Sequence, residues 1–140
     1  MILVDTGPLV AAALSGDAHH RRCVDLFMSL HLNAEPMLIP SLVVTEVCYL
    51  LEREGGPRAE AGFLHGLGNE DFIVVDLEPV DYLRAEELVL RYADLPLGAV
   101  DASVVAVAER LRITEVATLD RRHFSVVRPN HVDAFRLLPE

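Results

Sequence analysis

Four acidic side chains of this 140-residue chain lie at positions that are not expected to face solvent. They are Asp5, Glu46, Asp101 and Asp120. Two ionised carboxylates about 5 Å apart, at an effective dielectric of about 20, repel each other by roughly 3 kcal/mol. If the four converge, some must protonate or divalent cations must lie between them. Oxygen ligands without a matching histidine and cysteine set favour Mg²⁺ or Mn²⁺ over zinc, and such ions suit phosphodiester hydrolysis.

Two of these acids, Asp5 and Asp120, directly follow short apolar segments that we expect to form strands. The segments are Ile2–Val4 and Val116–Leu119. In open α/β sheets, ligands bind in the crevice at the carboxyl ends of the strands. Both side chains are therefore expected at one edge of the sheet, where a site would form. Either acid, taken alone, also fits a helix cap or a turn.

The other two acids lie on the apolar sides of expected helices. The helical neighbours of Asp101 are Leu97, Val104, Val105 and Ala108, and those of Glu46 include Leu42, Val43, Tyr49 and Leu50. A carboxylate on a buried stripe is unfavourable unless it is paired or binds a metal. For Asp101 the alternative is a buried ion pair or a helix-end cap. For Glu46 the alternative is a side chain that reaches solvent at the edge of the stripe.

Short apolar segments alternate with longer helical patterns along the chain. Strands are predicted at residues 2–5, 37–39, 72–75, 116–119 and 124–127, and helices at 9–14, 17–30, 41–54, 58–67, 79–93 and 99–112. Strands that alternate with helices imply a parallel sheet covered on both faces. We therefore expect an α/β fold, a three-layer sandwich with a short, mostly parallel central sheet. One domain is expected over residues 1–140.

Composition limits the class of protein. With 51% hydrophobic and 24% charged residues, the chain matches an ordinary globular protein rather than a disordered or fibrous one. The net charge of −10 argues against broad adsorption to nucleic acid or membranes. An acidic site that recruits cations is nevertheless compatible with a nucleic-acid enzyme. No secretory signal or membrane-length apolar run is visible, so we expect a soluble cytoplasmic protein with free thiols at Cys23 and Cys48.

The segments around the four acids resemble the PIN-domain ribonucleases and, within them, the VapC-type toxins of bacterial toxin–antitoxin pairs. The matching segments are Leu3–Thr6, Thr45–Val47, Val100–Ala102 and Thr118–Asp120, the last followed by Arg121–Phe124. Their order and spacing fit over essentially the whole chain. Each motif alone is weakly specific, whereas four in order form a strong signal.

The resemblance implies a Mg²⁺- or Mn²⁺-dependent endoribonuclease that hydrolyses RNA with metal-activated water. By analogy, Asp5 and Asp101 would hold the principal metal, and Glu46 and Asp120 would act as further ligands or position the water. Thr6 could contribute its hydroxyl or backbone, and Thr118 could orient the acids. The family also implies a homodimer, inhibited by a small VapB-like antitoxin whose C-terminal segment occupies the active-site groove.

Other readings of the same residues remain open. The chain could be a catalytically silent PIN-like module that only binds a partner. A phosphatase with Asp5 as nucleophile is disfavoured because the second aspartate expected two residues later is Gly7. The Asp5-Thr6-Gly7 triplet matches aspartic proteases by letter, but those enzymes are all-β. A receiver domain would need a lysine, and the chain has none.

Several residues near the four acids have no settled role from the sequence. Arg121 and Arg122 either contact RNA phosphates or antitoxin carboxylates, or face solvent. Asp94 is either an extra acid near the site or a loop residue that caps the next helix. The histidines show no metal-ligand spacing. His123 is therefore expected to be structural or to face the substrate rather than to bind metal.

Overall fold

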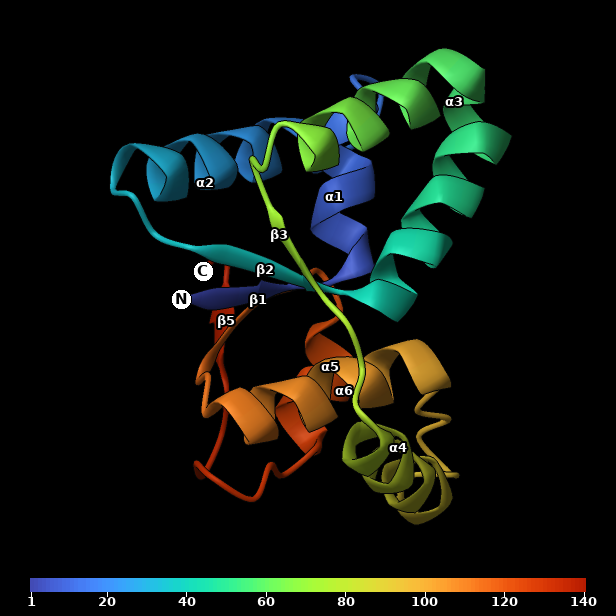
Figure 1. Cartoon of the computed structure of the whole chain (residues 1–140), viewed down its shortest axis with the longest axis vertical. Helices are drawn as coiled ribbons and strands as arrows, with labels where there is room; N and C mark the ends of the chain where they lie inside the picture. The colour runs from blue at the N-terminus through green and yellow to red at the C-terminus, as the bar shows by residue number, and fades with distance from the viewer.

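A five-stranded, all-parallel sheet forms the centre of the computed structural model, which describes residues 1–140 (Figure 1). The strands are β1 (Ile2–Val4), β2 (Met37–Pro40), β3 (Ile73–Val75), β4 (Glu115–Ala117) and β5 (Arg136–Leu138). Their order in the sheet is β3-β2-β1-β4-β5. This arrangement confirms the predicted α/β fold with a short parallel sheet. β1 is fully buried in the centre, which its uninterrupted apolar sequence requires of a strand covered on both faces.

Helices cover both faces of the sheet. They are α1 (Thr6–Ala13), α2 (His20–Leu32), α3 (Ser41–Gly68), α4 (Pro79–Arg91), α5 (Ala99–Leu111) and α6 (Arg121–Val126). Figure 1 shows α1, α2 and α3 above the sheet and α4, α5 and α6 below it. The most deeply buried helix is α5, where every residue from 102 to 108 is buried. No helix combines the length and hydropathy that crossing a bilayer needs.

The strand predicted at residues 124–127 is wrong. Arg121–Val126 forms helix α6, and Asp120 caps it by accepting a hydrogen bond from the backbone N–H of His123 at 3.0 Å. The fifth strand lies instead at Arg136–Leu138, beside β4. Phe124 packs edge-on against Phe135, with ring centroids 6.3 Å apart, so its burial comes from a helix packed on the sheet and not from a strand within it.

The break predicted between helices at 41–54 and 58–67 is a kink within α3. Gly56 has φ 75° and ψ −175°, a conformation that glycine adopts readily, and Pro57 lacks the N–H of a regular turn. Other predicted bounds shift by a few residues. The first helix begins at Thr6 instead of Leu9, and the second begins at His20, although Asp17 does accept a hydrogen bond from the backbone N–H of His19.

Candidate active site

A cleft of about 690 Å³ opens at the carboxyl ends of β1 and β4. It is lined by Asp5, Thr6, Gly7, Glu46, Gly98, Ala99, Val100, Asp101, Leu119 and Asp120. All four acids singled out from the sequence therefore line one cleft. They come from different elements: the β1–α1 junction, α3, the first turn of α5 and the residue that caps α6.

Asp5 is the most buried of the four acids, with 4% of the residue exposed. Its backbone N–H donates to the carbonyl of Ala117 at 2.9 Å, which continues the pairing of β1 with β4 for one more residue. One carboxylate oxygen, Oδ2, accepts a hydrogen bond from the Thr118 hydroxyl at 2.9 Å. The other, Oδ1, is buried without a hydrogen-bond partner, as is the hydroxyl of Thr6.

This environment disfavours the charged form of Asp5. Burial raises the pKa of Asp5 to about 7, and the negative charges of Asp101 and Glu46 act in the same direction. Hydrogen bonds from the Thr6 backbone and the Thr118 side chain lower the pKa and limit this rise. Protonation of the Asp5 carboxyl group is therefore favoured at a much higher pH than for an exposed aspartate when no cation is nearby.

Thr118 connects two of the acids. Its hydroxyl donates to Asp5 and accepts a hydrogen bond from the backbone N–H of Asp120 at 2.9 Å. The residue is fully buried just beyond β4, and its own N–H donates to the carbonyl of Leu138 at 2.9 Å. This geometry agrees with the expectation that Thr118 orients the acids.

Asp101 faces the cleft from the first turn of α5, and 19% of its side chain is exposed. Burial raises the pKa of Asp101 above its ordinary value, and the charges of Asp120 and Glu46 add to this rise. The hydrogen bond with His123 opposes it. Asp101 is thus an acid on a mostly apolar helix with only one cationic or polar partner in the protein.

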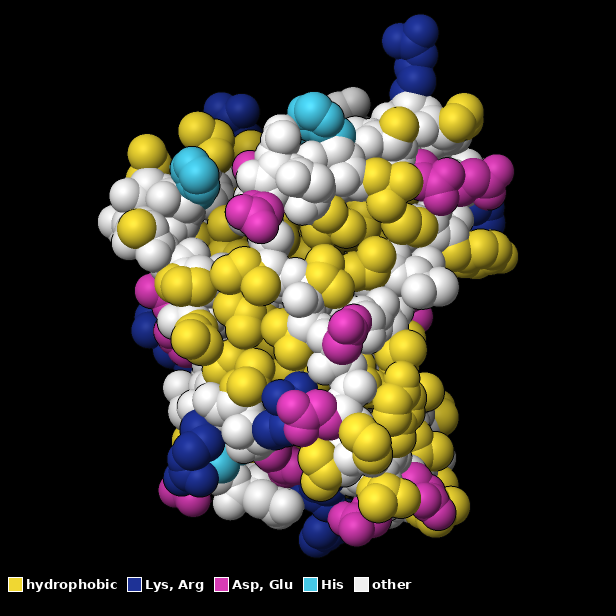
Figure 2. Space-filling model, in the orientation of Figure 1, with side chains coloured by type: hydrophobic (Ala, Val, Ile, Leu, Met, Phe, Trp, Pro, Cys, Tyr) yellow, Lys and Arg dark blue, Asp and Glu magenta, His cyan; other side chains and the backbone are white.

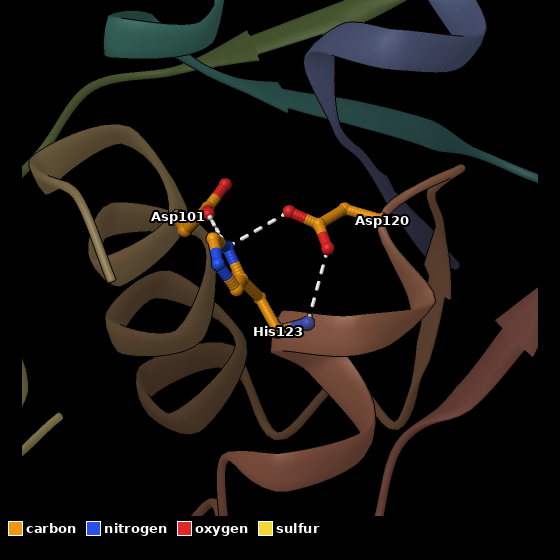
Figure 3. Close-up of side chains that lie close together, drawn as sticks. All are labelled: Asp101, Asp120 and His123. Atoms are coloured by element: carbon orange, nitrogen blue, oxygen red, sulfur yellow. Dashed lines mark hydrogen bonds and ion pairs between the residues drawn. The ribbon is translucent and has the colours of Figure 1, made fainter. Parts of the chain in front are cut away.

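His123 lies between Asp101 and Asp120 (Figure 3). Its Nδ1 is 2.7 Å from Oδ2 of Asp101 and 2.8 Å from Oδ2 of Asp120, and its Nε2 is 3.1 Å from the carbonyl oxygen of Leu95. The hydrogen bond with Asp101 is the main cause that raises the pKa of His123. Sequence reasoning did not foresee these contacts, although His123 follows the helix-capping Asp120 by three residues, a spacing that brings side chains together.

Glu46 and Gly7 line the cleft from α3 and α1, on the face of the sheet opposite to α5 and α6. Glu46 is half-buried on α3, and its charge raises the pKa of both Asp5 and Asp101. Gly7 lies where the first turn of α1 passes close to Leu119, since a Cβ at this position would be 3.3 Å from the Cβ of Leu119. A larger residue would press on the side chain of Leu119, the residue that precedes Asp120.

Among the residues whose roles were open, Arg121, Arg122 and Asp94 do not line the cleft. The Arg121 guanidinium donates to the carbonyl of Pro139, whereas Arg122 is exposed and makes no hydrogen bond or ion pair with the protein. Asp94 is exposed in the turn between α4 and α5 and does not line the cleft, which matches a loop residue. Both cysteines are free thiols, as expected.

The donors of this cleft fit a hard divalent cation. Oδ1 of Asp5 and the Thr6 hydroxyl are buried oxygens without partners, which is costly for a protein that does not use them. The neighbouring ligands available are carboxylate oxygens, the type that Mg²⁺ and Mn²⁺ prefer. A cation in the cleft would also relieve the charge repulsion that raises the pKa of Asp5 and Asp101.

Comparison with known families identifies the family to which this fold belongs. The PIN domain family matches residues 2–129, a span that includes all four acids. The chain belongs to the PIN-domain family. Ribonuclease VapC26 of Mycobacterium tuberculosis is 29% identical to this PIN domain over 141 residues, covering 99% of the chain and 100% of the relative.

Solved structures of the family share the fold. VapC20 of M. tuberculosis, a toxin that cleaves the sarcin–ricin loop, superposes with a TM-score of 0.76 at 25% identity, over 83% of this PIN domain and 87% of VapC20. DNA-bound VapBC of Salmonella typhimurium superposes with a TM-score of 0.68 at 20% identity, over 97% of this PIN domain and 95% of the matched chain. FitAcB of Neisseria gonorrhoeae superposes with a TM-score of 0.65 at 20% identity, over 89% of this PIN domain and 91% of the matched chain. Within its family, this PIN domain is of the VapC type.

Proposed function

We propose that Asp5 and Asp101 hold the divalent cation with which this VapC-type endoribonuclease toxin hydrolyses RNA, and that Glu46 and Asp120 serve as further ligands or position the attacking water. The observation that carries the proposal is the buried, unpartnered Oδ1 of Asp5 in a cleft that contains the other three acids. Mg²⁺ is the expected ion and Mn²⁺ a substitute, because every candidate ligand is an oxygen.

In the reaction, the side chains of the cleft bind the cation and orient the attacking water. When bound, the cation supplies an activated water and stabilises the leaving oxygen of the phosphodiester. Thr118 engages Oδ2 of Asp5 in a hydrogen bond and leaves Oδ1 without a partner in the protein. Glu46, on the other wall, is suited to accept a hydrogen bond from the attacking water and to align it. Because the proposed substrate is cellular RNA, we propose that the toxin acts in the cytoplasm.

An exposed arginine beside the cleft is suited to contact the RNA backbone. Arg122 lies two residues after Asp120, is exposed, and has no carboxylate partner in the protein. Guanidinium groups bind phosphate oxygens in a bidentate manner. Because the chain carries a net charge of −10, such local contacts must hold the substrate, since the overall field repels it.

An antitoxin segment is the proposed inhibitor, with its C-terminal part in the active-site cleft. Support comes from a mostly apolar groove along α1, lined by Leu9, Ala12, Ala13, Val24, Phe27, Met28, Arg58, Ala59, Gly62, Phe63, Gly66, Asp71 and Phe72. The groove runs along α1, whose first turn carries the cleft residue Thr6. A peptide that fills the groove would therefore reach the cleft along α1. The solved VapBC and FitAcB complexes, which share this fold, also support an antitoxin partner.

A homodimer is proposed on the face around α4. Figure 2 shows hydrophobic side chains gathered over α4, where Val80, Tyr82, Leu83 and Leu90 are each more than half exposed. A neighbouring groove continues this surface to α3 and α5 through Leu42 and Ala99. Large apolar patches on a small protein usually mark an interface. Sedimentation of the isolated toxin is expected to give a dimer, whereas a Leu83→Glu, Leu90→Glu variant should be monomeric.

Cleavage of end-labelled total RNA by the purified protein tests the activity. Discrete fragments are expected with Mg²⁺ or Mn²⁺ and none with chelator. Asp101→Asn should yield none under any condition. Cleavage that persists in chelator or in Asp101→Asn would contradict the metal role. Well-folded protein that cuts no RNA with either metal would favour a partner-binding module instead.

A further inference from the structure

The His123 side chain holds two acids of the cleft at once. Its single Nδ1 contacts Oδ2 of Asp101 at 2.7 Å and Oδ2 of Asp120 at 2.8 Å (Figure 3). The ring is also held from the other end, because Nε2 lies 3.1 Å from the carbonyl oxygen of Leu95 in the turn between α4 and α5. Three separate segments of the chain therefore fix the orientation of one imidazole.

Asp120 uses both of its oxygens on this one residue. Oδ1 accepts a hydrogen bond from the backbone N–H of His123 at 3.0 Å, and Oδ2 lies 2.8 Å from Nδ1 of the ring. Asp101 differs, since only its Oδ2 contacts His123 and its Oδ1 accepts no hydrogen bond from the protein. Asp5 likewise has a free Oδ1. Asp5 and Asp101 therefore each have one oxygen that accepts no hydrogen bond from the protein, whereas both oxygens of Asp120 contact His123.

We propose that His123 is a positioning residue for the metal site, which turns the free oxygen of Asp101 toward the cation, and that Asp120 acts through His123 instead of binding the cation directly. This inference rests on the proposed metal site of Asp5 and Asp101, and it replaces the role of Asp120 as a further ligand with an indirect one. Residues that hold a ligand by hydrogen bonds commonly fix its orientation, and their loss typically weakens metal binding by about 10- to 100-fold.

The two amide isosteres of histidine separate this role from simple packing. The side-chain nitrogen of asparagine takes the place of Nδ1, whereas that of glutamine takes the place of Nε2. His123→Asn therefore keeps the donor to Asp101 and Asp120, and His123→Gln keeps only the contact with the Leu95 carbonyl. A merely structural role would favour His123→Gln, which is closer in size to histidine.

Calorimetric titration of the metal-free variants with Mn²⁺ alone measures this difference without RNA. His123→Gln and His123→Ala are expected to bind Mn²⁺ about 10- to 100-fold more weakly than the wild type. His123→Asn should retain most of the wild-type affinity. Equal affinity in His123→Gln and the wild type, or a loss in His123→Asn as large as in His123→Gln, would overturn the inference. Far-UV circular dichroism and thermal unfolding in chelator verify that each variant folds.

A double-mutant cycle tests the indirect role of Asp120. Asp120→Asn retains the capping oxygen for α6, so the helix is preserved. If Asp120 acts through His123, Asp120→Asn weakens Mn²⁺ binding in the wild-type background. The same substitution then lowers the Mn²⁺ affinity of His123→Ala only slightly further. Losses that multiply would show that Asp120 binds the ion independently and would overturn the inference.

Two further outcomes separate the failure of this inference from the failure of the metal site. Electron spin echo spectra of the Mn²⁺-loaded protein are expected to lack a directly bonded nitrogen. A strong nitrogen coupling that disappears in His123→Ala would make His123 a ligand and overturn its positioning role alone. Wild-type protein that binds no Mn²⁺ would overturn the proposed site, and the inference with it.

Discussion

The Thr118 hydroxyl donates to Oδ2 of Asp5 at 2.9 Å, across 113 positions of sequence. The bond is buried and joins the ends of β1 and β4, and Thr118 also accepts the backbone N–H of Asp120. One small side chain thus connects two acids and leaves the second oxygen of Asp5 without a hydrogen-bond partner.

Replacing Thr118 by valine, which has nearly the same shape, should destabilise the protein. The change leaves Oδ2 of Asp5 and the N–H of Asp120 without a buried partner, and each loss of this kind costs about 1–3 kcal/mol. Urea unfolding in chelator measures the difference in the free energy of unfolding. Thr118→Ser keeps the hydroxyl and is the matched control. A valine variant as stable as the serine variant would argue against a structural role for the bond.

Asp101→Asn should remove activity without loss of stability. The amide oxygen still accepts a hydrogen bond from His123, while one of the repelling charges that raise the pKa of Asp5 disappears. The free energy of unfolding without metal is therefore expected to equal or exceed that of the wild type. Unfolding curves beside RNA cleavage assays check both parts. A variant with full activity would refute the role of Asp101 as a ligand.

The metal-free protein should lose stability as pH rises from about 4 to about 7. Burial raises the pKa of Asp5 from 3.8 to about 7, so between these values the folded state holds a proton that the unfolded state has released. Stability then falls with rising pH. The raised pKa of Asp101 acts with the same sign above pH 3.8, whereas the raised pKa of His123 lowers stability only as pH rises above about 6.5. With about 1.4 kcal/mol for each pKa unit, Asp5 alone contributes as much as about 4 kcal/mol.

Asp5→Asn isolates this contribution to the pH dependence. Free energies of unfolding in chelator, measured at several pH values, should fall less steeply for the variant than for the wild type. Saturating Mg²⁺ should also flatten the wild-type profile, because a bound cation keeps Asp5 ionised. An unchanged slope in Asp5→Asn would contradict the raised pKa.

Mn²⁺ should raise the melting temperature of the wild type in proportion to its binding to the folded state. The Asp5→Asn, Asp101→Asn double variant lacks the two acids that are proposed to hold the ion, and its melting temperature should not respond. Differential scanning fluorimetry over a range of Mn²⁺ concentrations measures both. A shift that persists in the double variant would locate the ion elsewhere.

The acids of the cleft were predictable because burying a charge breaks an otherwise apolar pattern. Asp101 interrupts the stripe of α5, and Asp5 ends the apolar strand β1. Each anomaly is local, and the convergence of strand ends in a parallel sheet brings them together. The same local reasoning predicted the sheet and most helices.

The errors arose where tertiary packing outweighs local pattern. The apolar residues at 124–127 suit a strand, but the cap from Asp120 starts a helix there. β5 was missed because its three residues follow a loop without a distinct apolar run. The contacts of His123 depend on how α6 approaches α5, which spacing alone does not describe.

Anomalous diffraction from crystals of the protein with Mn²⁺ tests the central claim most directly. The account predicts one strong manganese peak in the cleft, in contact with Oδ1 of Asp5 and a carboxylate oxygen of Asp101, and no such peak in Asp101→Asn. A manganese peak bound away from both residues, or one that remains in place in Asp101→Asn, would contradict it.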